Sequence, residues 1–374
     1  MAAMRVAFYA PMKPPQHPVP SGDRRIARLL LEALRLAGHD PVIASTFRSR
    51  EPKGDITRQA RLAELGQTLA LRLVNQWHGP KPDAWLTYHL YYKAPDWIGP
   101  LVAEAWGIPY LVVEASYAPK RAGGQWDMGH RAVAEAVRRA AAVLCLNPND
   151  RACLEPLAPG RLRDLPPFLN TAPFLDAGSI RPELAARHGI DPAEPWLLAV
   201  GMMRRGDKLA SYTVLAEALA QIPADPWQLL IAGGGEAAAE VRALFAPFGR
   251  RVAWLGQLEE SALAQVYKSA DLLVWPAIRE AFGMALLEAQ ASGLPVVAGK
   301  TDGVPAVVAD GGTGLLPPPG DSAAFAGAVQ SLLRNPARRE AMGQAAKARA
   351  VGHHSLESAA VTLDQILQEV TCRS

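Results

Sequence analysis

The sequence predicts an α/β protein built from two doubly wound domains that face a central cleft. The chain has 374 residues, a length that suits two domains of ordinary size. Short apolar runs alternate with longer segments whose apolar residues recur at helical spacing, and this order favours parallel sheets covered by helices. The alternation weakens once, from Asn170 to Pro195, where glycines and prolines gather and where we place the interdomain linker.

The first domain, residues 1–180, is predicted to begin with an apolar strand at 4–10 and a proline-rich loop. Ser21 or Asp23 caps the helix that follows, and Gly38 ends it. The pattern then repeats through strands at 41–44, 84–88, 108–114 and 141–146 and helices at 55–78, 100–106, 129–139 and 150–157. Because a strand, a helix and a second strand in this order form a parallel unit, one parallel sheet is expected.

The second domain, residues 190–352, repeats this alternation from a buried strand at 196–200. The further strands are expected at 228–232, 251–254, 272–275 and 295–298, and the helices at 210–221, 237–245, 261–269, 283–293 and 322–333. A final helix within residues 355–372 is expected to pack back on the first domain. Because ligands of open α/β sheets bind beyond the carboxyl ends of the strands, two facing sheets would enclose a binding cleft.

The stretch from Asp271 to Gly299 carries the clearest chemical signal. A buried strand ends at Pro276, a short loop holds Glu280, and a helix that Gly283 opens holds Glu288. The first N–H groups of a helix lack intrahelical partners, and the helix dipole favours an anion beside them. Two carboxylates eight positions apart can then reach hydroxyl groups on either side of that anion. This combination suits a nucleoside diphosphate sugar.

Cations and glycines follow the first two strands of the second domain. Gly201 follows the first strand, and Arg204, Arg205 and Lys208 lie in the next loop, where they could hold a diphosphate and stabilise a leaving group. A solvated loop is the alternative interpretation. Gly234, in the glycine run after the second strand, allows a ligand to approach the backbone closely, although a plain turn explains it equally well.

Polar residues of the first domain also fall at strand ends. His89 and Glu114 each end a strand, where they could contact a sugar or deprotonate an acceptor hydroxyl. A packed or hydrogen-bonded structural role is the alternative for both. Five more residues are placed on the acceptor side, at the start of the first helix or shortly after Glu114: Gly22, Asp23, Arg24, Lys120 and Arg121.

Composition excludes several functional classes. No apolar run approaches membrane-spanning length and the N-terminus lacks the features of a signal peptide, so a cytoplasmic protein is expected. No nucleic-acid partner is expected either. The three cysteines lack metal-ligand spacing and no Asp-x-Asp pair occurs, so no metal is expected. Residues 1–180 hold 22 Lys and Arg against 16 Asp and Glu, a balance of +6 that suits either peripheral contact with the inner membrane face or merely solvated helices.

The segment WPAIREAFGMALLEAQASGLPVVAG, residues 275–299, resembles the E-x7-E element of family 4 glycosyltransferases with the GT-B fold. Gly256, Gly314–Leu316 and NPARREAMG from Asn335 also fall where that family has like residues, so the resemblance covers the second half nearly from end to end. The first half matches more loosely, by strand order and by Gly22. The resemblance implies two Rossmann-like domains and a retaining, metal-independent enzyme whose substrate is a nucleotide sugar, such as a UDP- or GDP-sugar.

By position, the resemblance implies that Glu288 holds the ribose of the donor and that Glu280 contacts its sugar. Backbone groups for the diphosphate or sugar would come from Phe282, Gly283 and Met284, and diphosphate-binding cations from Lys208 with Arg204 or Arg205. Two departures stand out. The usual Gly-Arg-Leu is Gly201-Met202-Met203 with Lys208 displaced by one position, and Glu114 replaces a histidine of the family.

The expected function is therefore transfer of a sugar from a nucleotide-activated donor to an acceptor hydroxyl, on a lipid-linked acceptor or a glycan of the cell envelope. One alternative is a nucleotide-sugar epimerase on the same fold, which would turn over the donor without an acceptor. A second is a non-catalytic protein that binds nucleotide sugars or glycans. The intact E-x7-E element argues against both.

Overall fold

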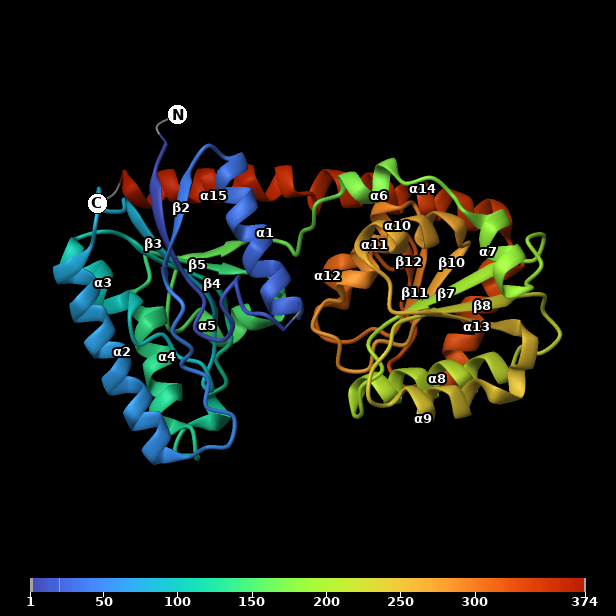
Figure 1. Ribbon diagram of the computed structural model, residues 1–374, viewed down its shortest axis with the longest axis horizontal. Coiled ribbons are helices and arrows are strands. Elements are labelled where there is room, and N and C mark those ends of the chain that lie inside the picture. Colours follow the sequence, from blue (N-terminus) through green and yellow to red (C-terminus); the bar gives the residue numbers. More distant parts are fainter. Residues whose placement is uncertain (1–2, 20, 373–374) are drawn as a thin grey trace. The chain divides into compact units, whose positions relative to one another are not determined.

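The computed structural model describes residues 3–19 and 21–372, which form two compact units. Unit 1 combines Met1–Pro166 with Leu356–Ser374, and unit 2 is Pro167–Ser355. Each unit contains its own six-stranded parallel sheet with helices around it (Figure 1). The two doubly wound α/β sheets expected from the sequence are therefore present.

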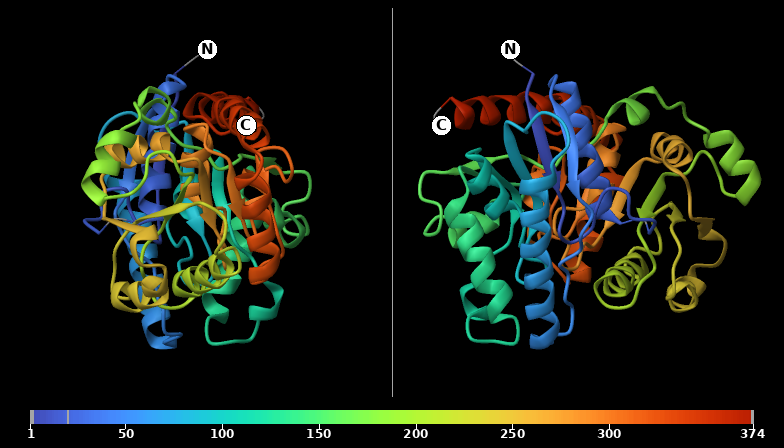
Figure 2. Two further views of the ribbon diagram at one scale, coloured as in Figure 1. Left: turned by 90° about the vertical axis from the view of Figure 1, so that its right-hand side faces the viewer. Right: turned by 60° about the vertical axis from the view of Figure 1, so that its left-hand side comes forward.

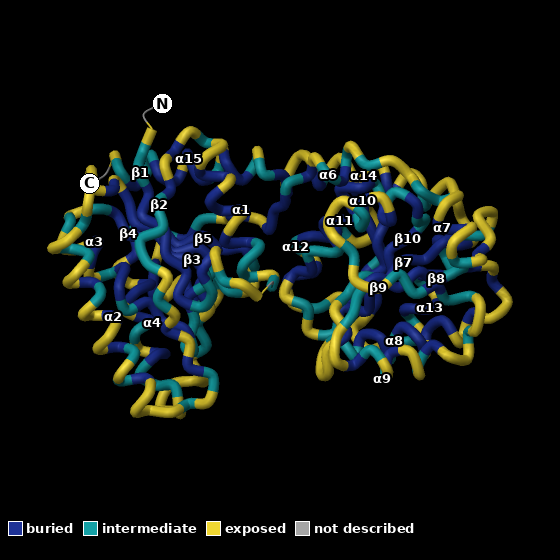
Figure 3. Tube along the Cα trace, in the orientation of Figure 1, coloured by how far each residue is buried: buried dark blue, intermediate teal, exposed yellow. Residues whose placement is uncertain are grey.

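The sheet of unit 1 has the strand order β2-β1-β3-β4-β5-β6. Its strands are β1 (Arg5–Tyr9), β2 (Asp40–Ser45), β3 (Ala84–Leu90), β4 (Tyr110–Ala115), β5 (Ala142–Cys145) and β6 (Leu162–Asp164). All neighbouring pairs are parallel, so the carboxyl ends of β3, β4 and β5 lie side by side at one edge. Figure 3 shows β3, β4 and β5 as almost entirely buried. Because both faces of these strands are covered, their sequences are continuous apolar runs.

The helices of unit 1 cover both faces of this sheet. They are α1 (Gly22–Leu36), α2 (Ile56–Gln76), α3 (Gly99–Trp106), α4 (Asp127–Arg139), α5 (Arg151–Leu154) and α15 (Leu356–Thr371), with 3-10 turns η1 (Pro119–Arg121) and η2 (Pro148–Asp150). One core contains Trp85, Tyr110 and Val112 of the strands and side chains of α2, α3 and α4. The N-cap of α1 is Ser21, whose side chain accepts a hydrogen bond from the Arg24 N–H.

The final helix α15 belongs to unit 1 and packs against α1. It runs beside the N-terminal elements in both views of Figure 2. Its Glu369 forms an ion pair of 2.6 Å with Arg163, and its Asp364 lies 3.2 Å from the imidazole of the buried His39. These contacts tie the end of the chain to β6 and to the loop between α1 and β2.

The sheet of unit 2 has the strand order β12-β11-β10-β7-β8-β9, again with parallel neighbours. Its strands are β7 (Trp196–Val200), β8 (Gln228–Ala232), β9 (Val252–Gly256), β10 (Leu272–Trp275), β11 (Val296–Ala298) and β12 (Gly314–Leu315). Its helices are α6 (Ala172–Asp176), α7 (Arg181–His188), α8 (Asp207–Ala220), α9 (Ala238–Phe245), α10 (Glu260–Ser269), α11 (Met284–Ala291), α12 (Val304–Val307), α13 (Ser322–Leu333), α14 (Pro336–His353) and the turn η3 (Ala246–Arg251). The first strand, β7, lies near the middle of the sheet, as in other doubly wound folds.

The segment proposed as a linker, Asn170 to Pro195, instead forms α6 and α7 of unit 2. Pro182 occupies the first turn of α7, where its missing N–H costs nothing, and Gly189 ends the helix with φ 64°. Two of the residues that suggested a linker, Pro182 and Gly189, therefore begin and end a helix. The Ile180 N–H and the Ser269 hydroxyl, 2.9 Å apart, fasten this segment to α10.

Candidate functional site

One basic and one acidic side chain at the centre of the predicted site in unit 2, Lys208 and Glu280, are in direct contact. The ammonium Nζ of Lys208 lies 2.5 Å from Oε2 of Glu280. The indole N–H of Trp275 donates a hydrogen bond of 3.2 Å to the same oxygen, and the ammonium lies 5.2 Å from the centre of that indole ring. Both charged side chains are partly exposed, 28% and 18%, so a ligand can reach them.

Lys208 is the second residue of α8 and does not lie in the preceding loop, as the sequence suggested. Gly206, with φ 82°, is the N-cap that turns the chain into this helix, which begins at Asp207, three positions earlier than periodicity indicated. In the loop that follows β10, Ala277 and Arg279 take positive φ values of 55° and 49°. This irregular backbone carries Glu280 back toward α8.

Glu288 lies on α11 and is 4% exposed. The Tyr267 hydroxyl donates a hydrogen bond of 2.8 Å to its Oε2. A buried carboxylate needs such donors because it has lost the hydrogen bonds of water. Gly283, the N-cap of α11, has φ 76°, and Phe282 before it is buried while Met284 after it is partly exposed.

The two arginines near Lys208 differ in their surroundings. Arg205 lies 2.8 Å from Glu240 of α9 in an exposed ion pair. Arg204 is also exposed. Its backbone N–H bonds to the Met202 carbonyl at 3.1 Å. Arg205 is thus drawn toward α9, while Lys208 pairs with Glu280.

The glycine run after β8 packs directly on the loop that leads to Lys208. The Met203 N–H donates to the Gly234 carbonyl at 2.9 Å, and the Gly201 carbonyl accepts from the Tyr212 hydroxyl at 2.9 Å. A Cβ atom at Gly233 would clash with the Gly201 carbonyl, and one at Gly235 with the Met203 carbonyl. The glycines therefore permit close contact between two backbone segments.

We expect Gly235→Ala to lower the free energy of unfolding by about 2 kcal/mol, because φ is 153° there and the new methyl group meets backbone. Thermal or urea unfolding measures the change. Gly234→Ala is the matched control, since a Cβ at this position meets nothing within 4 Å. Equal stability of the two variants would contradict this account of the turn.

In unit 1, four titratable side chains converge at the carboxyl edge of the sheet. Asp23 comes from the first turn of α1, His89 from β3, Glu114 from β4 and Asp150 from the turn after β5. The Nδ1 of His89 lies 2.9 Å from Oδ1 of Asp23. His89 and Glu114 both have left-handed backbone, with φ 60° and 61°, which is uncommon for such residues. Two adjacent strands therefore end in the same unusual turn.

The charges of this group act on one another. Burial alone would lower the pKa of His89, but the negative charges of Glu114, Asp23 and Asp150 raise it from 6.5 to about 8. Burial would raise the pKa of Asp23, yet the hydrogen bond and charge of His89 hold it below its ordinary value. Burial, followed by the charge of Glu114, raises the pKa of Asp150 to about 6.

We expect Asp23→Asn to return the pKa of His89 toward 6.5, because the neutral amide removes one of the charges that stabilise the imidazolium. A folded-state pKa above the ordinary one means that protonated His89 stabilises the fold below pH 6.5. This contribution is lost as the pH rises through about 8. NMR titration of the imidazole protons measures the change, with Asp127→Asn on α4 as control. An unaltered titration in Asp23→Asn would refute the pairing.

The other predicted residues of unit 1 make separate contacts. The guanidinium of Arg24 donates to the carbonyls of His17 and Pro18, at 2.8 and 3.1 Å, and so holds the proline-rich loop. Lys120 and Arg121 are exposed on η1, with Arg121 stacked 4.9 Å from the Tyr92 ring. Gly22 is the first residue of α1 and Asp23 the second.

Sequence reasoning missed three polar or aromatic contributors to these groups: Trp275, Tyr267 and Asp150. Asp150 follows the end of β5, so the same rule that selected His89 and Glu114 would have found it. Trp275 and Tyr267 read as apolar members of a strand and a helix. Their N–H and O–H groups matter only through the carboxylates that they meet in the fold.

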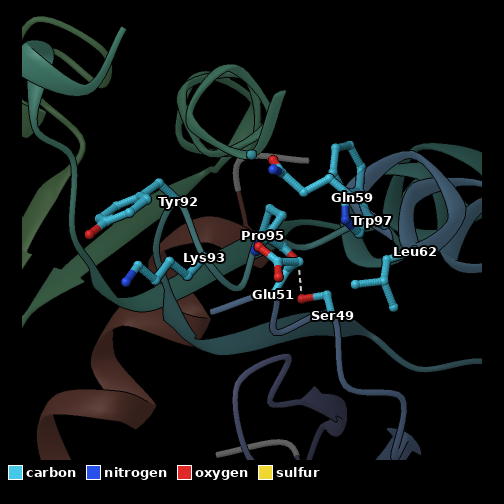
Figure 4. Close-up of a pocket in the computed structure, with 9 residues that line it drawn as sticks. Ser49, Glu51, Gln59, Leu62, Tyr92, Lys93, Pro95 and Trp97 are labelled. Carbon is cyan, nitrogen blue, oxygen red and sulfur yellow. Dashed lines mark hydrogen bonds between the residues drawn. The ribbon is translucent and has the colours of Figure 1, made fainter. Parts of the chain in front are cut away.

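The small pocket shown in Figure 4 is distinct from both groups. It lies in unit 1 and has a volume of about 10 Å³, room for a single water molecule. It is lined by Ser49, Glu51, Gln59, Leu62, Tyr92, Lys93, Pro95, Trp97 and Gly129. The Ser49 hydroxyl donates to the Pro95 carbonyl at 2.6 Å. The size and the internal bonding of this pocket fit a structural cavity.

Metal-ligand clusters and membrane-spanning helices are both absent from residues 3–19 and 21–372. Within them, no three His, Cys, Asp or Glu side chains are grouped in a way that could hold a metal ion. No helix in the same residues is long and apolar enough to cross a membrane.

Comparison with known proteins gives consistent results. Residues 181–349 match the family model described as glycosyl transferases group 1. A D-inositol 3-phosphate glycosyltransferase of Pseudarthrobacter chlorophenolicus is 31% identical over 294 residues, which cover 74% of this chain and 69% of the relative. A phosphatidyl-myo-inositol mannosyltransferase of Mycobacterium leprae is 42% identical over 117 residues, 31% of each chain.

Solved structures are similar over almost the whole chain. Sucrose-phosphate synthase of Thermosynechococcus elongatus has a TM-score of 0.73 at 22% identity and covers 99% of this chain and 100% of its own. HepE of Anabaena, solved in complex with UDP, has a TM-score of 0.74 at 16% identity and covers 98% and 100%. At these identities the likeness concerns the fold.

Proposed function

The chain belongs to the group 1 glycosyl transferases of family 4 and has their GT-B fold, and from this we propose a retaining, metal-independent transfer reaction. The donor would be a nucleoside diphosphate sugar and the acceptor a hydroxyl group. The observation that supports this best is the contact between Lys208 and Glu280, which brings a cation and a carboxylate together just before α11.

Each residue of unit 2 then has a proposed role. Glu288, already oriented by Tyr267, would accept hydrogen bonds from the ribose hydroxyls of the donor. Glu280 would accept from hydroxyls of the donor sugar. The first N–H groups of α11, with Gly283 before them, would meet the diphosphate, which the helix dipole favours. Arg204 is the better placed of the two arginines to assist, since Arg205 is paired with Glu240.

The Lys208 ammonium would stabilise the leaving diphosphate. When the bond between the anomeric carbon and the diphosphate oxygen breaks, the electron pair stays on that oxygen and negative charge develops there. A cation already in position stabilises this charge without proton transfer and without reorganisation during the step. Before the donor binds, Glu280 holds the ammonium in place and Trp275 limits its rotation. This arrangement is the electrostatic part of the proposed mechanism.

The acceptor would bind at the carboxyl edge of the sheet in unit 1. His89 or Glu114 would accept the proton of the acceptor hydroxyl as the new bond forms. We also propose a glycan or lipid-linked acceptor with peripheral contact at a membrane surface, supported by the balance of +6 in residues 1–180 and by exposed Arg58, Arg61 and Arg72 on α2. Flotation with anionic liposomes tests this contact, which should weaken as salt rises.

A panel of nucleotide sugars tests the proposed function directly. Purified protein should release nucleoside diphosphate from one donor, slowly with water and faster with an acceptor, and EDTA should leave the rate unchanged. Epimerisation of the donor without an acceptor would favour the isomerase alternative. Binding without any release would favour a non-catalytic protein, and neither binding nor release with any donor would refute the proposal.

A further inference from the structure

The carboxyl edge of the sheet in unit 1 holds more negative than positive charge. Asp23, Glu114 and Asp150, named here the acidic subsite, come from three separate elements, α1, β4 and η2, and all three act electrostatically on His89. The charges of His89 and Lys13 both act on Asp23. The donor and acceptor roles proposed above do not require three carboxylates at one place.

One carboxylate oxygen of Glu114 lacks a hydrogen-bond partner among the described residues. The Tyr88 hydroxyl donates to its carboxyl group. The Oε2 atom is buried from solvent and has no hydrogen-bond partner among the residues that the structure describes. A buried carboxylate oxygen without a donor costs free energy, which a ligand that supplies the donor would recover.

The carboxylate of Asp150 also has only a weak hydrogen bond from Ser116. Its Oδ1 accepts a hydrogen bond from the Ser116 hydroxyl at 3.4 Å, the long end of the usual range. Burial, followed by the charge of Glu114, raises the pKa of Asp150, and burial, with a smaller effect from the charge of Asp23, raises the pKa of Glu114. A phosphate or carboxylate of a ligand would increase this repulsion. A positively charged hydrogen-bond donor would relieve it.

We propose that the acidic subsite binds a protonated amine on the sugar or polyol part of a substrate. An ammonium group has three donors, enough to serve Oε2 of Glu114 and the Asp150 carboxylate together, and its charge complements the excess of carboxylates. The inference deepens the proposed function and rests on it, since it assigns a chemical class to one substrate of that reaction. It also separates this chain from relatives whose names specify an inositol phosphate.

Calorimetric titration at pH 6.5, where the amine is charged, tests the inference in two arms. The acceptor arm compares glucosamine, glucose and glucose 6-phosphate, and the donor arm compares UDP-glucosamine with UDP-glucose. We expect the amine in one arm to bind about tenfold or more tightly than its hydroxyl counterpart, in line with a hydrogen bond to a charged group. The arm that shows the preference identifies the substrate that carries the amine.

Glu114→Gln should abolish this preference while the protein keeps its circular dichroism spectrum and its affinity for UDP. Glu104→Gln is the matched control, because Glu104 is an exposed glutamate of α3, with 70% of its side chain accessible. Equal binding of amine and hydroxyl in both arms, a preference for the 6-phosphate, or a preference that survives Glu114→Gln would overturn the inference. Because binding needs no turnover, failure of sugar transfer would show separately in the donor panel.

Discussion

Lys208→Ala should lower kcat for sugar transfer about 100- to 1000-fold, the effect of removing one preorganised charge contact to a transition state, or about 3 kcal/mol. The ammonium meets Glu280 at 2.5 Å, a contact that fixes its position next to the proposed diphosphate site. The methyl side chain of alanine carries no charge that could replace that of the Lys208 ammonium. Steady-state release of nucleoside diphosphate with a saturating donor measures the change.

Two controls separate this effect from a loss of folding. Lys347→Ala makes the same change at an exposed position of α14 and should leave kcat unaltered. Thermal unfolding of Lys208→Ala should be near that of the unaltered protein, because both side chains of its ion pair still reach solvent and such pairs contribute only about 1 kcal/mol or less to stability. A kcat that stays within about twofold would remove Lys208 from the proposed mechanism.

Glu288→Ala should weaken binding of the donor about 10- to 100-fold with a smaller effect on kcat, since hydrogen bonds to a charged group contribute about 1.5–3 kcal/mol. Ribose hydroxyls do not change during the reaction, so their loss affects the ground state and the transition state alike. Calorimetric titration with the nucleoside diphosphate alone measures the effect without turnover.

Tyr267→Phe is the graded companion of this variant. It removes the hydroxyl that donates to Glu288 at 2.8 Å but keeps the ring and the carboxylate. We expect a loss of affinity of only a few fold, because the carboxylate remains and is merely less well oriented. If Glu288→Ala bound the nucleoside diphosphate as tightly as the unaltered protein, the ribose would have to lie elsewhere.

Much of this fold could be predicted from the chain because its signals are local. Buried strands such as 196–200 and 228–232 are short apolar runs between glycines and prolines, and β7 and β8 have the same bounds. α14 was missed because many of its residues are small alanines, and Gly343 packs against the backbone of Gly293. Close packing of small residues leaves little periodic signal in a sequence.

The site was less predictable, because its decisive contacts join distant positions. Glu280 could be singled out by its neighbours, but its contact with Lys208 spans 72 residues and depends on a positive φ at Ala277. The ion pair of Arg205 with Glu240 likewise follows from the packing of α8 beside α9. Strand ends predicted His89 and Glu114, whereas their charge balance with Asp150 required coordinates.

The position of α15 has a consequence for how the protein is made. The ribosome completes Pro167–Ser355 before it releases the helix that closes the first unit, so unit 2 can fold while unit 1 still lacks Leu363 and Leu367 of its core. During synthesis the apolar face of α1 therefore stays uncovered for the time needed to translate a whole domain. A nonsense mutation that removes Leu356–Thr371 would then damage the part of the protein that was synthesised first.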